Sequence, residues 1–232
     1  MVTEKPKRKP RADMGKMRKQ VLFISARSFL EKGFTATTVK EIAELADINI
    51  GSLMNLFNTK EDILADLVKY VLEGQFKATA NLLKGRTEDK ILFYAAETTL
   101  QLHMAESSEH IRDIYKAAYS LSATTDIIQQ TITHKLEEIF GDSLPDLETK
   151  DFFELEIASG GIMRGFLTMP CDMYFTMDRK VKRFLETTFK LYDVPKEKIE
   201  EAIRFVSGFD FEVIAKQTIR KMLDYLDENK VA

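Results

Sequence analysis

The side chains of this sequence that are best suited to chemistry lie near its N-terminus, in a basic arm and in a narrow, polar helix start. The cations of the arm are Lys5, Lys7, Arg8, Lys9 and Arg11. Pro6 and Pro10 oppose regular structure there, so the arm is either a solvated tail or a segment that reaches a DNA groove. Further along, Asn49, Gly51 and Ser52 would give a helix a slim first turn, whose free N–H groups favour phosphate oxygen. The pattern points to recognition of a polyanion.

Residues for metal or covalent catalysis are scarce. The chain holds three His and one Cys, which supplies a zinc or two-metal centre poorly. A di-iron bundle needs Glu-x-x-His pairs on two helices, whereas Glu106 with His110 and His134 with Glu137 have the wrong order or spacing. Cys171 has no His near it in sequence, and there is neither a phosphate-binding glycine loop nor a nucleophile elbow. We expect no enzyme, no metal and no cofactor.

Charge is divided unevenly along the 232 residues, whose net charge is −3. Through position 64 there are 12 Lys or Arg and 8 Asp or Glu, which gives +4. The remainder holds 22 and 29, which gives −7. A basic head on an acidic body predicts a polyanion partner at one end only.

No membrane or secretory segment is expected. No stretch approaches the roughly 18–20 uninterrupted apolar residues that span a bilayer. The charged N-terminus has no apolar run behind it, and a single Cys suits a reducing compartment. We therefore expect a cytoplasmic protein without a membrane partner.

Helix signals divide residues 14–64 into three short helices and the start of a fourth. Apolar residues recur with a period near 3.6 over residues 14–32, and Gly33 ends that helix. Asp47 suits the tight turn after the second helix, because a small Asx residue tolerates unusual backbone angles. The residues that cap helices two, three and four are Thr38, Asn49 and Thr59. This is the outline of a helix-turn-helix DNA reader.

The same region resembles the N-terminal domain of the TetR-like, tetracycline-repressor-type family of transcriptional regulators. The matching run is Phe29-Leu30-Glu31-Lys32-Gly33-Phe34, Thr37-Thr38-Val39-Lys40-Glu41-Ile42-Ala43, Ala46, Gly51-Ser52-Leu53, Phe57 and Thr59-Lys60-Glu61. The resemblance covers about 45 residues in the family's order and spacing. It implies a dimeric repressor whose C-terminal helical domain binds a small molecule and releases DNA.

By that resemblance, Thr38 and Lys40 would contact the DNA backbone and a base edge, and Lys60 would hold a phosphate. The full set of expected DNA-binding residues is Thr38, Lys40, Asn49, Ile50, Gly51, Ser52, Met54, Asn55 and Lys60. The sequence departs from the family at Met54 and Leu56, where aromatic or Tyr/His side chains are usual, and at Asp47, where glycine is usual. These departures imply fewer contacts from the recognition helix and more reliance on the arm and Lys60.

The remaining chain is expected to be entirely helical, because no alternating strand pattern occurs. The fourth helix runs to about residue 83, and further helical runs cover residues 88–107, 109–121, 125–140, 148–169, 178–192 and 195–228. The sequence thus predicts an all-α fold with a helix-turn-helix domain and a larger helical bundle for ligand binding and dimerisation. The expected divisions are an arm over residues 1–13, a DNA-binding domain over 14–64 and a body over 65–232.

Apolar and aromatic residues concentrate in the middle helices, where most serve core packing. Some are expected to line a cavity for a small apolar or amphipathic effector, because Met and aromatic walls adapt to irregular ligands. The expected ligand-binding residues are Phe93, His103, Met104, His110, Tyr115, Tyr119, Phe153, Met163, Arg164 and Phe166.

Glycines within the 148–169 run indicate a close approach of another helix, since each costs about 1 kcal/mol in a helix relative to alanine. The terminal run is apolar on more than one face, so the two runs together predict a symmetric four-helix seam. The expected dimer residues are Gly160, Gly161, Gly165, Ile203, Val206 and Ile214. A homodimer would bind a pseudo-palindromic double-stranded operator. The alternative is an architectural or partner-binding DNA protein without a small-molecule ligand.

Overall fold

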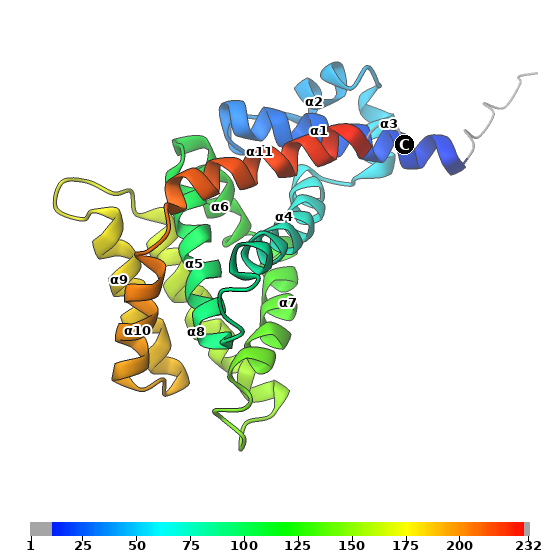
Figure 1. Ribbon diagram of the computed structural model, residues 1–232. Helices are drawn as coiled ribbons and strands as arrows, with labels where there is room; N and C mark the ends of the chain where they lie inside the picture. Colours follow the sequence, from blue (N-terminus) through cyan, green and yellow to red (C-terminus); the bar gives the residue numbers. More distant parts are fainter. Residues whose placement is uncertain (1–10, 230–232) are drawn as a thin grey trace, which may run out of the picture.

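The computed structural model describes residues 11–229, which contain eleven α-helices, one 3-10 helix and no strand (Figure 1). The N-terminal helices are α1 (Arg11–Lys32), α2 (Val39–Leu45), α3 (Ile50–Leu56) and α4 (Lys60–Leu83). The body adds α5 (Lys90–Glu106), α6 (Glu109–Ala118), α7 (Ser122–Phe140), α8 (Thr149–Thr168), α9 (Met177–Thr188), η1 (Phe189–Tyr192), α10 (Lys196–Val206) and α11 (Phe211–Asn229). The all-α expectation is confirmed. Residues 1–10, with most of the expected arm, lie outside the described residues.

The caps predicted for the helix-turn-helix region, residues 14–64, are all present. Thr38 and Glu41 form the capping box of α2, Asn49 caps α3, and Thr59 forms a second box with Asp62 on α4. Each cap supplies a hydrogen bond to a backbone group that a helix end leaves unpaired. The four helices close around one small core, whose fully buried members include Val21, Phe29, Ile42, Leu53, Phe57 and Ile63.

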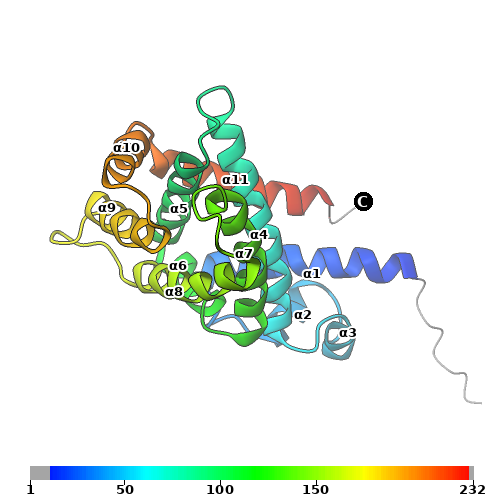
Figure 2. The ribbon, with the colours of Figure 1, turned by 90° about the horizontal axis from the view of Figure 1, so that it is seen from below.

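Helix α5 is the centre of the body, because every residue from Tyr94 to Leu102 is buried. Helices α4, α7, α10 and α11 pack around it (Figures 1 and 2). At its start, the Tyr94 ring meets the stacked rings of Phe140 and Tyr192, whose centroids lie 4.1 Å apart. The aromatic pairs join α5, α7 and the 3-10 turn into one rigid block.

Two of the expected helices are interrupted. The run over residues 195–228 is not one helix but two, since α10 ends at Val206 and α11 begins at Phe211. The Asp210 carboxylate accepts the Val213 N–H at 3.1 Å and so begins a new helix. The run over residues 178–192 gives way to the 3-10 turn after Thr188, and the first helix begins at Arg11, earlier than expected. The period of the apolar residues does not indicate these breaks.

The break before α11 lets that helix turn back along α1 (Figure 1). The Tyr70 hydroxyl of α4 donates to the Met222 carbonyl oxygen at 2.8 Å, and its ring stacks on that of Tyr225. Gly74 allows the close approach, because a Cβ there would lie 2.5 Å from the Met222 methyl group. Helices α1, α4 and α11 therefore join the DNA-binding domain to the body.

Candidate nucleic-acid interface

The turn between α2 and α3 has the geometry that a helix-turn-helix needs. Asp47 adopts a left-handed conformation with φ of 52°, a region in which Asp and Asn are among the better tolerated side chains. The Ile48 N–H donates to the Ala43 carbonyl oxygen at 3.0 Å, which closes the turn. From α1, the Gln20 amide donates to the Ala46 carbonyl oxygen at 3.1 Å. The angle between the two helices is thus fixed by hydrogen bonds as well as by packing.

Helix α3 has one buried and one open side. Leu53 is fully buried in the domain core, whereas Ile50 and Met54 are 47% and 38% exposed. Asn55 and Gly51 are also exposed, and Ser52 is half-buried. The open side therefore offers an apolar strip with an amide beside it, which suits a thymine methyl group and a base edge.

The first turn of α3 is slim because its cap is the short Asn49 side chain and the next residue but one is a glycine. The Asn49 carbonyl Oδ1 accepts the Ser52 N–H at 2.8 Å. A Cβ at Gly51 would lie 3.3 Å from that same oxygen, so a larger residue would crowd the cap. Glycine here leaves the first turn able to approach a nucleic-acid backbone closely.

Thr38 and Lys40 lie at the start of α2, as expected, and both are exposed. The Thr38 hydroxyl and N–H are engaged with Glu41, whose carboxylate accepts the N–H at 3.0 Å. Lys32 also donates to Glu41 at 2.7 Å, and this hydrogen bond is the main reason that the Glu41 pKa falls to about 2. Lys40 makes only a loose pair with Glu44 at 3.8 Å, so its ammonium can reach a phosphate.

The expectation for Lys60 requires correction. Its ammonium donates to the carbonyl oxygens of Phe34 and Thr37, at 2.8 Å each, and lies 4.2 Å from the centre of the Phe34 ring. These contacts direct the charge into the turn between α1 and α2. Lys60 therefore holds the domain together rather than extending toward a phosphate.

Arg18 is a structural residue of this domain that the sequence did not reveal. Its guanidinium donates to the Leu56 carbonyl oxygen at 2.7 Å and to the Asp66 carboxylate at 3.1 Å, and it lies 4.2 Å from the Phe57 ring centre. These contacts hold the C-terminal end of α3 against α1 and α4. No local signal could have identified them, since the partners are 38 and 48 positions away.

Helix α6 of the body contacts the DNA-binding domain directly. The Asp113 carboxylate accepts both the N–H and the hydroxyl of Thr35, at 2.7 and 2.8 Å. A Cβ on Gly33 would lie only 2.8 Å from this carboxylate, and Gly33 has a positive φ of 85°. His110 approaches the Leu30 carbonyl oxygen at 3.2 Å. A displacement of α6 would therefore also displace the turn that precedes α2.

An apolar cavity of about 120 Å³ lies at the junction of the two parts. It is lined by residues of α1, α4, α5, α6 and α11, including Phe29, Leu67, Val71, Met104 and Met222. The polar side chains of its lining are hydrogen-bonded, Tyr70 to the Met222 carbonyl oxygen and the other four in two pairs. Gln75 donates to the Tyr115 hydroxyl at 2.7 Å, and Gln101 donates to the Tyr119 hydroxyl at 2.8 Å.

The structure brings five of the ten expected ligand-binding residues to cavities. Met104, Tyr115 and Tyr119 line the apolar cavity, while Phe93, Tyr119 and Met163 line a smaller one between α4, α5, α7 and α8. The five that line neither are His103, His110, Phe153, Arg164 and Phe166.

These residues lie away from both cavities, and His110 contacts the Leu30 carbonyl oxygen. His103 lies against the Phe211 ring, and the Phe166 ring packs on that of Phe184. Phe153 and Arg164 are exposed on the outer side of α8. An aromatic-rich stripe in the sequence does not distinguish the inner from the outer side of a helix, so the sequence alone cannot exclude Phe153 and Arg164 from the ligand-binding set.

The expected dimer residues are also divided. Gly161 and Gly165 are exposed on α8, on the side that also carries Phe153 and Ile157, which are 41% and 53% exposed. Gly160 is half-buried beside Glu156. Ile203 and Ile214 are half-buried against the body core, and Val206 is buried within it, so Val206 cannot reach a partner. The outer side of α8 is the part of this expectation that remains open to a second copy.

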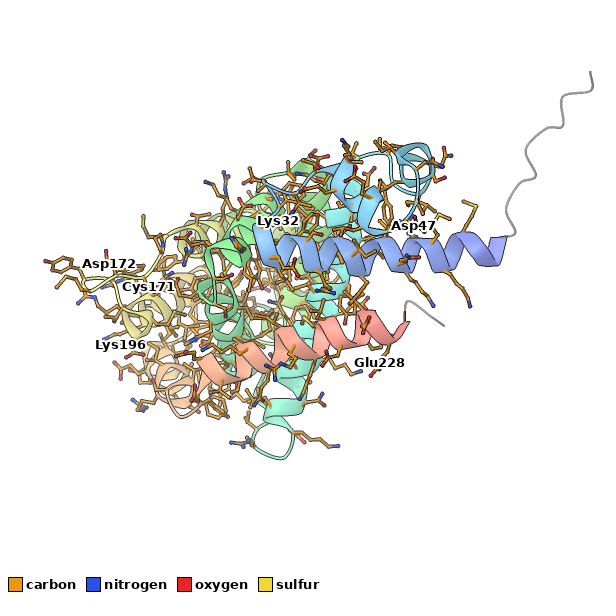
Figure 3. All side chains as sticks on the ribbon, turned by 90° about the horizontal axis from the view of Figure 1, so that it is seen from above. Lys32, Asp47, Cys171, Asp172, Lys196 and Glu228 are labelled. Carbon is orange, nitrogen blue, oxygen red and sulfur yellow. The ribbon has the colours of Figure 1, made fainter. Side chains whose placement is uncertain are left out.

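Chemistry-bearing residues elsewhere are structural. The Cys171 N–H donates to Glu106, which also accepts a hydrogen bond from the buried Lys180 at 2.7 Å, and burial raises the pKa of the Cys171 thiol. Figure 3 shows Cys171, Asp172 and Lys196 at the end of the molecule opposite to Asp47. Within residues 11–229 there is no group of three metal-ligating side chains, and no helix long and apolar enough to cross a membrane.

Comparison with known proteins agrees with the geometry. Residues 25–67 match the family described as "Bacterial regulatory proteins, tetR family". The "Probable HTH-type transcriptional regulator YttP" of Bacillus subtilis (strain 168) is 27% identical over 146 residues, which are 61% of this chain and 63% of that protein. The "HTH-type transcriptional repressor KstR2" of Rhodococcus jostii (strain RHA1) is 32% identical over 82 residues, 35% of this chain and 40% of that protein.

The chain spans less than two thirds of the length of these two relatives. A solved gamma-butyrolactone receptor (ArpA-like protein) covers 90% of this chain and 99% of its own, with 14% sequence identity and a TM-score of 0.42. The helix-turn-helix geometry agrees with the family match at residues 25–67, so this part of the chain is similar to the N-terminal domain of tetR-family regulatory proteins.

Proposed function

We propose that the protein is a DNA-binding transcriptional repressor that acts as a homodimer and is released from its operator by a small molecule. The observation that carries the proposal is the open side of α3. Its exposed residues follow a capped, glycine-containing first turn, and hydrogen bonds from Gln20 and Arg18 fix its position. A helix presented in this way fits the major groove.

The residues proposed to touch DNA divide into two kinds. Ile50, Met54 and Asn55 face outward from α3 and would read base edges. Lys40 and Thr38, at the start of α2, would contact the backbone. Because Lys60 is engaged internally, salt dependence should arise mainly from Lys40, from α1 and from the basic N-terminal residues.

The homodimer is proposed to form through the outer side of α8. Phe153, Ile157, Gly161 and Gly165 recur at spacings of four, so they share one side of the helix. Two large apolar side chains next to two glycines would let a symmetry-related helix pack closely. Such a pair would present two α3 helices to successive major grooves.

Release by an effector is proposed to pass through the apolar cavity. A ligand shifts an equilibrium only by the difference between its affinities for the two states. A ligand in this cavity of about 120 Å³ would touch the helices that line it. Helix α6 is one of them and carries Asp113, which holds Thr35. The cavity favours this sensor over an architectural DNA protein with a filled core.

The DNA-binding proposal is tested with the purified chain and a pool of genomic fragments from its own source. Selected fragments are footprinted, and binding is then measured by fluorescence anisotropy at several salt concentrations. We expect two protected half-sites, and we expect Lys40→Ala to lower the salt slope by roughly one unit. The matched control is Lys84→Ala, whose side chain is exposed far from α3. Absence of any selected fragment at low salt would refute the proposal.

A further inference from the structure

The smaller cavity, of about 40 Å³, contains two buried carboxyl groups that nothing in the DNA-binding proposal uses. Glu97 of α5 is 5% exposed and Glu156 of α8 is 3% exposed, and both line the cavity. Glu156 accepts a hydrogen bond from the Ser159 hydroxyl at 2.8 Å. Oε1 of Glu97 has no hydrogen-bond partner among the described residues.

No nearby protein cation compensates these groups. Among the described lining residues, Lys135 is the one cation, and its ammonium lies 2.6 Å from the Glu138 carboxylate at the surface. Removal from water accordingly raises the pKa of Glu97 to about 7 and that of Glu156 to about 8. Buried carboxyl groups without a counter-charge are costly, and a bound cation would offset that cost.

The two cavities share a wall. Gln101 and Tyr119 line both, and their mutual hydrogen bond separates the apolar space from the acidic one. On the apolar side, Oε1 of Gln75 is also without a partner among the described residues. The unpaired lining atoms on both sides, Glu97 Oε1 and Gln75 Oε1, are both side-chain oxygens that can accept a hydrogen bond. A group that satisfies Glu97 Oε1 must donate a hydrogen bond, whereas the apolar surroundings of Gln75 suit a hydrocarbon that leaves Gln75 Oε1 as it is.

Aromatic rings complete the acidic end. Phe76 and Phe93 lie nearly parallel, with ring centres 6.4 Å apart, and the Lys135 ammonium lies 5.6 Å from the Phe76 ring centre. Tyr94 and Tyr119 line the same cavity. Ring faces attract cations, and most strongly where water is excluded. Carboxyl groups, ring faces and unpaired acceptors therefore all favour the same kind of group.

We propose that the effector is a cationic amphiphile, an amine whose hydrocarbon part occupies the apolar cavity and whose ammonium group lies at Glu97 and Glu156. Binding opens the Gln101–Tyr119 hydrogen bond and joins the two spaces. The inference rests on the proposed effector role of the body and adds the chemical class of the ligand. It also makes the ligand bridge α5 and α8 to the junction with the DNA-binding domain.

The test uses the full chain and a matched pair of probes, n-hexylamine and n-hexanol, with binding measured by calorimetry. We expect the amine to bind about tenfold or more tightly than the alcohol at neutral pH. In the double variant Glu97→Gln/Glu156→Gln, amine affinity should fall to that of the alcohol, whose own affinity stays unchanged. Glu73→Gln, an exposed carboxyl on α4, is the control. Equal affinities in the original chain, no binding of either probe, or an unaffected amine in the double variant would overturn the proposal.

A second measurement does not depend on a variant. The ammonium favours ionised carboxylates, so amine affinity should rise between about pH 6 and pH 9, whereas alcohol affinity should not. The other titratable groups at the site are Tyr94, Tyr115, Tyr119, Tyr192 and Lys135. Burial raises the pKa of all four tyrosines, so they remain neutral in this range. An amine affinity independent of pH would contradict the inference.

Operator binding separates this inference from the function on which it rests. If the protein binds its selected DNA and the alcohol releases it as well as the amine, the repressor stands and the amine class fails. If the amine binds in the expected way but no DNA fragment is selected, the site stands and the repressor proposal fails.

Discussion

Replacement of Glu97 by Gln should stabilise the protein at alkaline pH and leave it unchanged at acidic pH. Burial raises the pKa of this carboxyl from 4.5 to about 7, because the cavity penalises the charged form. Below pH 4.5 the group is protonated in both the folded and unfolded chains, so it costs nothing. As pH rises from 4.5 to about 7, the unfolded chain releases its proton first and the free energy of unfolding falls.

The size of this effect follows from the shift. Each pKa unit corresponds to about 1.4 kcal/mol, so a shift of this size removes up to about 3 kcal/mol by pH 8. Glutamine has the same shape and no charge to lose. Urea unfolding of the original chain and of Glu97→Gln at pH 4 and pH 8 measures the difference, and Glu73→Gln serves as the exposed control. Identical pH dependence in all three proteins would refute the reasoning.

Three further predictions concern the junction, the DNA-binding domain and the dimer. Lys60→Met should lower the free energy of unfolding by about 1–2 kcal/mol without changing the salt slope of DNA binding, since the ammonium donates to two backbone carbonyl oxygens. Asp113→Ala should cost about 1 kcal/mol, because the Thr35 N–H loses its acceptor, and should reduce the effector-induced fold-change in operator affinity. Phe153→Asp should give monomers in analytical ultracentrifugation, because it places a charge on the open side of α8.

Each of these has a result that would contradict it. If Lys60→Met reduced the salt slope of DNA binding and left the free energy of unfolding unchanged, Lys60 would contact a DNA phosphate after all. An unchanged effector response in Asp113→Ala would remove α6 from the route between the cavity and the turn. Dimers that persist in Phe153→Asp, as they should in the control Met173→Asp, would place the interface elsewhere; Met173 is 80% exposed.

The DNA-binding domain could be predicted from the sequence because its signals are local. Thr38, Asn49 and Thr59 each act on a backbone group three positions away, so their spacing alone identifies the helix starts. Asp47 is also a local signal, because a small Asx residue tolerates the left-handed backbone of the turn. The contacts of Arg18 and Lys60 join distant positions, and their residue types fit a DNA contact equally well.

The body was predicted less completely. The sequence indicated a cavity among the middle helices but assigned its polar contacts to His and Arg. The sequence does carry a signal for the buried Glu97, which is the one Asp, Glu, Lys or Arg between positions 91 and 105, in a run otherwise apolar or neutral. A lone charge in such a run is surrounded by core rather than by solvent. Which side of α8 faces inward depends on tertiary packing, which periodicity does not define.

Helix α11 changes the mechanics of the molecule. If α4 alone connected the helix-turn-helix region to the body, that region could rotate about α4. Mutual packing of α1, α4 and α11 restricts this rotation. This arrangement resists bending and yields mainly when the three helices are spread apart. The apolar cavity lies between these helices, so a bound molecule would push them apart. In a dimer, the distance between the two α3 helices would then vary with the size of that molecule.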